Sequence, residues 1–178
     1  MGCGAGIRGA DGVVLAADRR VLDGHRVRSD DLRSLETVDN VAIAVVGEPS
    51  GVQGFHREIR ADIRSYELEH DRQITMESLT RLASEDANQH EVSVILAAPG
   101  DDGTARLRQI DACGGSIDDD RVAIGEPKAV VLGLLEQLDR DTSVSELVDT
   151  LTDRLEQAAA RHVAIGGELD VAVVSDTS

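Results

Sequence analysis

The sequence is poor in cysteine and lysine and contains no long apolar segment. Its two cysteines, Cys3 and Cys113, are too few for a disulfide framework, and their spacing matches no zinc-binding motif. Apolar runs such as residues 41–46 and 92–98 are far shorter than the roughly 20 residues that cross a bilayer. The first twelve residues lack a basic segment followed by an apolar stretch, so they do not resemble a secretory signal. We therefore expect a cytoplasmic protein with no membrane contact, metal ion or cofactor.

The 178-residue chain has a large excess of acidic residues. Aspartate and glutamate total 34 against 18 lysine and arginine residues, for a formal net charge of −16, and Lys128 is the single lysine. The acids are scattered along the whole chain, which is typical of a solvated acidic surface rather than of a disordered tail. Halophilic proteins use a large net charge in this way, and the pattern favours a halophilic protein over an ordinary acidic one. The same charge disfavours binding to nucleic acid, whose phosphates would be repelled.

The spacing of apolar residues predicts strands and helices in separate groups. Short alternating or continuous apolar runs predict strands at residues 4–9, 13–18, 35–38, 41–46, 92–98, 105–111 and 169–174. Steps of three and four residues, with capping residues such as Ser143 and Glu146, predict helices at residues 50–68, 75–87, 127–140 and 143–162. Helices grouped between antiparallel strand pairs are typical of helix layers on sheets. We expect an α+β fold in one domain spanning residues 1–178, since no linker or repeat interrupts the chain.

Six segments carry a family resemblance. The segment GIRGADGVVLAADRRV (residues 6–21) resembles the opening of proteasome β subunits, in which a nucleophile strand leads into D-G-V-V-L-A-A-D-x-R. Five further segments resemble later parts of the same family, in the same order: VDNVAIAVVG (38–47), FHREIRADIRSYEL (55–68), IDACGGSIDDDRVAIG (110–125), GLLE (133–136) and GGELDVAVVS (166–175). The extension typical of α-type subunits does not precede the first segment, which favours the β type.

The resemblance implies a fold and a set of partners. Members of this family have the N-terminal-nucleophile hydrolase fold, a four-layer αββα sandwich, and assemble into rings. The chain is similar to a divergent, haloarchaeal-like member. Its expected partners are therefore copies of itself or other subunits of a proteasome-like ring.

The resemblance also identifies the positions at which active members carry their catalytic groups. In those members an N-terminal threonine attacks the peptide carbonyl and its own amine takes up the proton, assisted by a lysine that an aspartate holds. The aspartate corresponds to Asp18, but the nucleophile position falls on Gly2 and the lysine position on Ser34. Arg33 could supply the missing charge after a shift of one residue, although a guanidinium does not release its proton. Asp18 itself is either buried with a partner or a solvated carboxylate at a strand end.

Later positions of the family site are also altered. Glu126 replaces the serine of a G-S-G turn, and in the segment that resembles R-D-S-x-S-G-G, His162 replaces the acid and Ile165 the second serine. Gly47 remains as the expected oxyanion-loop glycine, or serves a turn that enters the following helix. The resemblance therefore implies a retained scaffold that has lost most of its chemistry. We expect a non-catalytic β-like subunit with a structural or regulatory role.

Cys3 supports an alternative hypothesis. Removal of Met1 and Gly2 would expose this cysteine, which is a good nucleophile, and would produce an N-terminal cysteine amidohydrolase or peptidase. The spacing from Cys3 to Asp18 is one residue shorter than the family pattern, and in a strand such a slip turns the side chain to the opposite face. The sequence favours the non-catalytic subunit. We expect Cys113 to be a small core residue and His162 a surface or helix-end residue.

Overall fold

A pair of hairpin strands lies at the centre of the first sheet. The computed structural model describes residues 2–177, and in it β1 (Cys3–Arg8) and β2 (Gly12–Asp18) form the predicted antiparallel hairpin. On their outer sides β10 (Arg121–Gly125) pairs with β1 and β11 (Leu169–Ser175) pairs with β2, so the order is β10-β1-β2-β11. Every residue of β2 is buried, because the sheet is covered on both faces.

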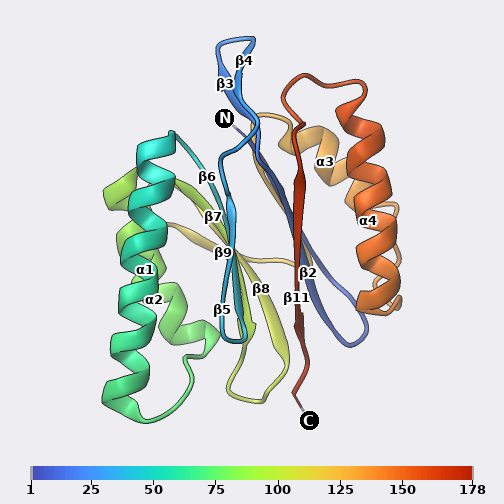
Figure 1. The fold of residues 1–178 in the computed structure, drawn as a ribbon. Helices are drawn as coiled ribbons and strands as arrows, with labels where there is room; N and C mark the ends of the chain where they lie inside the picture. The colour runs from blue at the N-terminus through green and yellow to red at the C-terminus, as the bar shows by residue number, and fades with distance from the viewer. Residues whose placement is uncertain (1, 178) are drawn as a thin grey trace.

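The second sheet contains five antiparallel strands. They are β5 (Leu35–Val38), β6 (Val41–Val46), β7 (Ser93–Pro99), β8 (Ala105–Ile110) and β9 (Ser116–Asp118), and they pair in that order. The strand β5 is therefore one free edge of this sheet and β9 is the other. The two sheets pack face to face, as Figure 1 shows.

Two pairs of helices cover the outer faces of the sheets (Figure 1). The helices α1 (Pro49–His70) and α2 (Met76–His90) lie on the five-stranded sheet, and α3 (Lys128–Leu135) and α4 (Val144–Ala159) lie on the four-stranded sheet. The result is the predicted α+β architecture of four layers, helix, sheet, sheet and helix. No helix within residues 2–177 combines the length and the apolar character needed to cross a bilayer.

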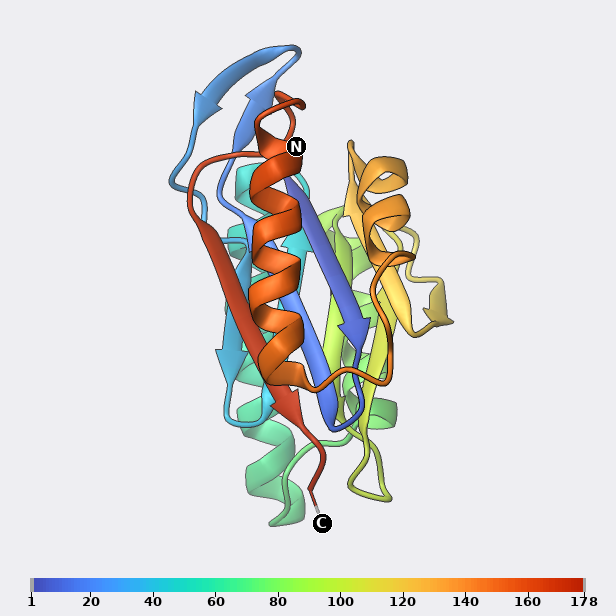
Figure 2. The same ribbon diagram turned by 90° about the vertical axis from the view of Figure 1, so that its right-hand side faces the viewer.

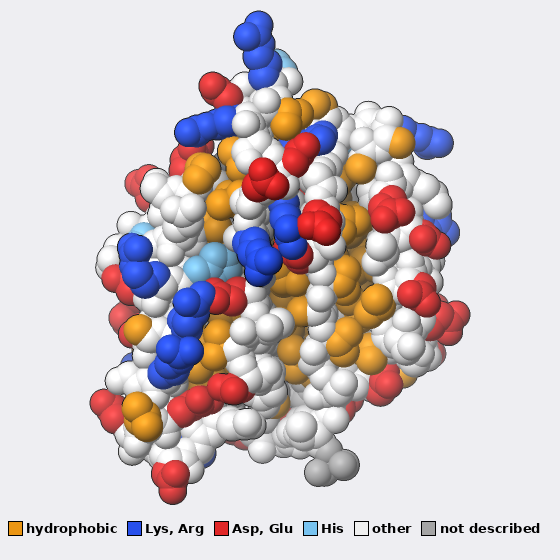
Figure 3. All heavy atoms as spheres, viewed as in Figure 1, with side chains coloured by type: hydrophobic (Ala, Val, Ile, Leu, Met, Phe, Trp, Pro, Cys, Tyr) orange, Lys and Arg blue, Asp and Glu red, His pale blue; other side chains and the backbone are white. Residues whose placement is uncertain are grey.

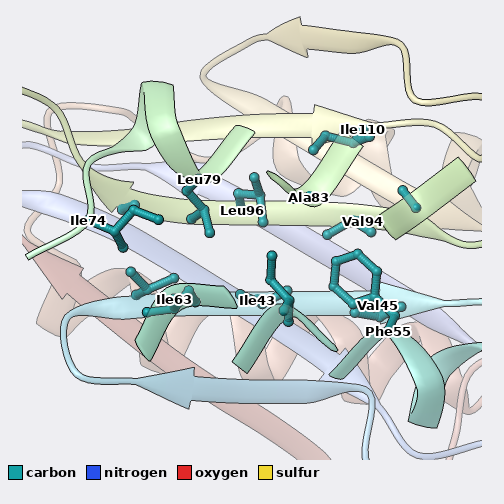
Figure 4. Packing of buried hydrophobic residues seen from close by; sticks show 14 of the residues in the cluster. Ile43, Val45, Phe55, Ile63, Ile74, Leu79, Ala83, Val94, Leu96 and Ile110 are labelled. Atoms are coloured by element: carbon teal, nitrogen blue, oxygen red, sulfur yellow. The ribbon is translucent and has the colours of Figure 1, made fainter. Parts of the chain in front are cut away.

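The apolar stripes predicted from the sequence form the interior of these layers. In the layer between α1, α2 and the second sheet, side chains from both helices interdigitate with those of β6 and β7 (Figure 4). The members labelled there include Phe55, Ile63, Leu79, Ala83, Ile43, Val45, Val94 and Leu96. Small residues let the two sheets approach at β1. A Cβ at Gly6 would lie 2.8 Å from side-chain atoms of Leu15 and Leu107.

The structure differs from the sequence prediction at short or irregular elements. The helix expected over residues 127–140 is α3, which ends at Leu135. The Arg121 side chain donates hydrogen bonds to the carbonyls of Leu135 (2.9 Å) and Leu138 (2.6 Å) at and beyond this end. The helix α4 begins as predicted, with the Ser143 hydroxyl accepting from the Glu146 N–H at 3.4 Å, but it ends at Ala159. The strands β9 and β10 were not predicted.

A small separate hairpin was also missed. It consists of β3 (Val21–Asp23) and β4 (Arg26–Ser29), which pair only with each other and extend beyond the sandwich (Figure 1). Most of its residues are exposed, so it lacks the alternation of apolar and polar residues that would identify a half-buried strand.

Candidate functional site

The start of β1 and the end of β2 bring position 2 beside Asp18. The Asp18 side chain is 1% exposed, and both of its oxygens accept backbone hydrogen bonds, Oδ1 from Cys3 at 2.8 Å and Oδ2 from Gly166 at 2.9 Å. A Cβ placed at Gly2 would lie 2.7 Å from Asp18 Oδ1 and 3.0 Å from the Arg20 carbonyl oxygen. The carboxylate therefore occupies the space in which a side chain at position 2 would begin.

Burial dominates the electrostatics of Asp18. Removal from water raises the pKa of its carboxyl group from the usual 3.8 to about 6, although the two backbone N–H groups and the charge of Arg20 oppose the shift. Of the alternatives left open by the sequence, the buried carboxylate with partners is the one observed. Its bonds join β1, β2 and the loop before β11, which are far apart in the sequence.

The residue that the resemblance aligns with the catalytic lysine is buried and neutral. Ser34 is 3% exposed, and its backbone carbonyl accepts from Val45 at 2.8 Å. Arg33 is exposed and lines a groove between β5 and α1. The guanidinium whose charge opposes the rise in the Asp18 pKa belongs to Arg20, and Arg33 is not among the groups that shift this pKa.

Arg20 is a site residue that the sequence reasoning missed. Its guanidinium pairs with Asp30 at 2.7 Å and donates to the backbone carbonyls of Val163 (3.1 Å) and Ile165 (3.3 Å). A side chain at Gly166 would collide with this guanidinium. The two arginines that follow Asp18 in the sequence were a signal for a nearby cation, but nothing in the sequence indicates which carbonyls one of them would bind.

Cys3 faces a different environment from position 2. Its side chain is 2% exposed and belongs to an apolar cluster between the four-stranded sheet and the α3–α4 layer, with neighbours such as Val131 and Leu135. Burial, and then the nearby Asp18 carboxylate, raise the pKa of the Cys3 thiol to about 12. The thiol is therefore protonated at neutral pH and faces the helix layer.

The remaining candidate positions are spread along the loops around this site. Gly125 has a φ of +100°, and its Cα packs against the Gly2 carbonyl so closely that no side chain fits. Glu126, next in the turn, is exposed. Gly47 follows β6, and a Cβ there would lie 2.8 Å from Val92 Cγ1, so glycine is needed for packing at the entry to α1.

Two of the late candidates lie just after α4. His162 is partly exposed and its backbone closes the turn, since its N–H donates to Ala158 and its carbonyl accepts from Ile165. Ile165 is 1% exposed and belongs to the same apolar cluster as Cys3. The helix-end placement expected for His162 is therefore observed.

The expectation for Cys113 is wrong. This cysteine is exposed, because it lies in a turn after β8 in which the Asp111 carboxylate accepts from the backbone N–H groups of Cys113 and Gly115, both at 2.9 Å. Within residues 2–177, no group of three or more histidine, cysteine or acidic side chains is arranged to hold a metal ion.

Comparison with known proteins gives one consistent result. Residues 2–174 match the family model of proteasome subunits. A proteasome subunit beta of Halorubrum lacusprofundi is 32% identical over 176 residues, which cover 96% of this chain and 72% of that protein. A proteasome subunit beta of Haloquadratum walsbyi is 31% identical with the same coverage. A proteasome subunit beta 1 of Hyperthermus butylicus is 30% identical over 176 residues, covering 95% of this chain and 86% of that protein.

Proposed function

The chain belongs to the proteasome subunit family as a β-type member, and we propose that it takes part in a proteasome-like assembly without cleaving peptide bonds itself. The observation that carries this proposal is the contact between position 2 and Asp18. In active members this position needs a side chain that can attack a carbonyl, and here it is a glycine whose missing Cβ would lie 2.7 Å from a carboxylate oxygen. Real Cβ atoms do not approach other atoms so closely, so a side chain at position 2 would require Asp18 to move.

The charges around the site support the same proposal. A lysine beside the N-terminal amine lowers the affinity of that amine for protons, which helps it act as a base. Ser34 has no charge to offer, and Arg20 is held by Asp30 and by two backbone carbonyls. The buried carboxylate of Asp18 binds backbone N–H groups on both of its oxygens. We propose that Asp18 has kept a structural role after the chemistry was lost.

The cysteine hydrolase receives no support from the surroundings of Cys3. A thiol with a pKa of about 12 provides very little thiolate at neutral pH, and thiolate is the nucleophilic form. Exposing it would also require β1 to release its contacts with the α3–α4 layer. A scaffold retained without its catalytic groups fits a role in assembly. The relatives that match this chain are named as proteasome subunits.

Activity measurements and the mass of the protein test the proposal together. Purified protein should not hydrolyse fluorogenic peptides above the rate of a buffer blank, with the Halorubrum lacusprofundi subunit, assembled with its partners, as the positive control. Intact-mass spectrometry should find at most the loss of Met1. Loss of both Met1 and Gly2, with turnover that Cys3→Ala abolishes, would contradict the proposal and establish the cysteine hydrolase.

A further inference from the structure

A basic groove lies between the edge strand β5 and α1, on a chain that is otherwise strongly acidic. It has a volume of about 630 Å³, and its lining includes Arg33, Arg57 and Arg60 but a single carboxylate, that of Glu36. Figure 3 shows arginine side chains, with a histidine among them, over α1 and β5 on this face. The groove therefore has an excess of positive charge in a chain whose net charge is −16.

The guanidinium groups of this groove differ in their pairing. Arg60 pairs with Glu36, and the same carboxylate lies beside His56. Arg33 and Arg57 form no ion pair within residues 2–177, although both line the groove. A guanidinium binds carboxylate or phosphate oxygens through two parallel N–H bonds. Two of the three arginines therefore have donors available for a ligand.

The groove also contains a buried side chain with hydrogen-bonding capacity to spare. His56 is 8% exposed, and in the part of the chain that the structure describes neither ring nitrogen makes an aligned hydrogen bond. Its Nδ1 lies 3.0 Å from a Glu36 oxygen. Burial lowers the pKa of His56 to about 4, with the Ser34 backbone opposing the shift, so the ring is neutral at pH 7. Buried polar groups are normally paired, so this ring indicates that the groove is complementary to a polar ligand.

The edge of β5 adds backbone donors to the groove. Figure 2 shows this strand at one side of the sandwich, and it pairs only with β6. The Ser34 carbonyl accepts from the Val45 N–H at 2.8 Å, and along an antiparallel ladder such bonded residues alternate with residues that face away from the partner strand. The backbone groups of Leu35 and Thr37 therefore point away from β6, and both residues line the groove.

We propose that the α1–β5 groove binds a phosphate group, either as free phosphate or as part of a small phosphate monoester. A phosphate monoester carries a charge of about −2 and three acceptor oxygens, which match several guanidinium and backbone N–H donors better than the single charge and two oxygens of a carboxylate. The volume lies within the range of pockets for small organic ligands, roughly 300–1,000 Å³. Gln53 and Thr37 add neutral hydrogen-bonding groups to the lining.

The surrounding charge favours a small ligand over a polymer. Nucleic acid carries many phosphates, and most of them would lie against the acidic surface outside the groove, where they would be repelled. A single phosphate group can enter the groove without meeting those acids. The site involves none of the positions at which active relatives carry catalytic groups, so it goes beyond the assembly role proposed above and does not depend on it.

Calorimetric titration of the purified chain in molar KCl tests the site. The probes are potassium phosphate, glycerol phosphate and, as the uncharged control, glycerol. Chloride at this concentration screens general attraction between exposed charges, so that binding requires direct hydrogen bonds. At least one phosphate probe should bind at one site per chain with a Kd of about 1 mM or lower, and glycerol should not bind. The probe with the lower Kd distinguishes free phosphate from a monoester, and binding of neither would overturn the proposal.

Neutral variants of the groove then test its residues. Arg33→Gln and Arg57→Gln should each raise the Kd about tenfold, because each removes charged hydrogen-bond donors. Glu36→Gln should lower the Kd, since it removes the one negative charge of the lining. Both arginines are exposed, so their variants should keep the thermal midpoint of the wild type.

The exposed Arg161→Gln, outside the groove, is the matched control and should bind as the wild type does. An unchanged Kd in both groove arginine variants would overturn the proposal. An equal loss in Arg161→Gln would do so as well, because it would show general attraction to positive charge. In either case the assembly role would stand, since it rests on other residues.

Discussion

Two buried titratable side chains, Asp18 at the end of β2 and His56 in α1, have opposite relations to their surroundings. Both are almost fully buried, at 1% and 8% exposed. Asp18 has a backbone donor on each oxygen, whereas within residues 2–177 neither ring nitrogen of His56 makes an aligned hydrogen bond, although Nδ1 lies 3.0 Å from a Glu36 oxygen. Burial shifts both towards the neutral form, raising the pKa of Asp18 to about 6 and lowering that of His56 to about 4. Both oxygens of Asp18 are therefore hydrogen-bonded, whereas the buried ring of His56 is less well satisfied.

The largest expected effect comes from removing the Asp18 carboxylate. Asp18→Ala would leave the buried N–H groups of Cys3 and Gly166 without acceptors, which should cost about 2–5 kcal/mol of unfolding free energy. Urea denaturation in molar KCl measures it. Asp23→Ala, at an exposed position in β3, is the control and should change stability by less than about 0.5 kcal/mol. An equal loss in both variants would show that Asp18 does not tie β1 to the loop before β11.

The pH dependence of stability separates the two regions by sign. The folded pKa of Asp18 lies above its unfolded value, so the folded state binds the proton more tightly and Asp18 makes stability fall as pH rises from about 4 to 6. The folded pKa of His56 lies below its unfolded value, so His56 makes stability rise over the same interval and lowers it on acidification. Each shift of about two pH units corresponds to roughly 3 kcal/mol.

Two variants should therefore change the slope in opposite directions. Between pH 6 and 4, His56→Phe should gain stability on acidification relative to the wild type, and Asp18→Asn should lose it. Asp86, whose pKa is also raised to about 6 by burial and by neighbouring acids, adds the same contribution to every variant. His25→Phe, at an exposed position, is the control. Slopes of the same sign in the two variants would contradict the comparison.

A side chain introduced at position 2 tests whether the Asp18 carboxylate can move to make room for it. Gly2→Thr restores the residue type used by active members, but its Cβ would lie 2.7 Å from the Asp18 oxygen, so we expect a loss of about 1–3 kcal/mol and no peptide hydrolysis. Gly133→Ala in α3, where a Cβ meets no atom within 4 Å, is the control and should not destabilise the protein. Hydrolysis by Gly2→Thr combined with Ser34→Lys would show that the site can reopen.

The smallest effect concerns the surface. Repulsion among the excess acids should weaken as salt is added, so the thermal midpoint should rise between dilute buffer and molar KCl, by about 2–4 °C for each 1 kcal/mol gained. Since Asp18 is buried, Asp18→Ala should show the same rise from a lower starting point. A midpoint that stays constant or falls with added salt would contradict the halophilic interpretation.

The elements that could be predicted are those with a strong local pattern. The apolar runs of β2 and β6 and the three- and four-residue steps of α1 predicted those elements closely, because burial of one face or both imposes a period on the sequence. The strands β3, β4 and β9 have only three or four residues, and β4 and β9 are fully or almost fully exposed, whereas β10 has five residues and a buried centre. Their positions depend on neighbouring strands, which a local pattern does not contain.

Resemblance predicted the composition of the site but not its geometry. It assigns Gly2, Asp18 and Ser34 to the family's catalytic positions, and this assignment stays a prediction. It could not identify Arg20 as the cation near Asp18, nor show that Cys113 is exposed. Both depend on where a turn directs a side chain and on which backbone groups it meets.

By itself the sequence determined that helices layer on antiparallel sheets, that position 2 has no nucleophilic side chain and that negative charge is in excess, since periodicity, residue identity and net charge are properties of the chain; the order of the four layers came from the family resemblance. The tertiary structure alone decided that the Asp18 carboxylate fills the space beside Gly2, that Cys3 faces the helix layer, and that His56 is buried beside Glu36. The physical reason is that burial, hydrogen-bond pairing and pKa depend on atoms brought together from distant parts of the chain.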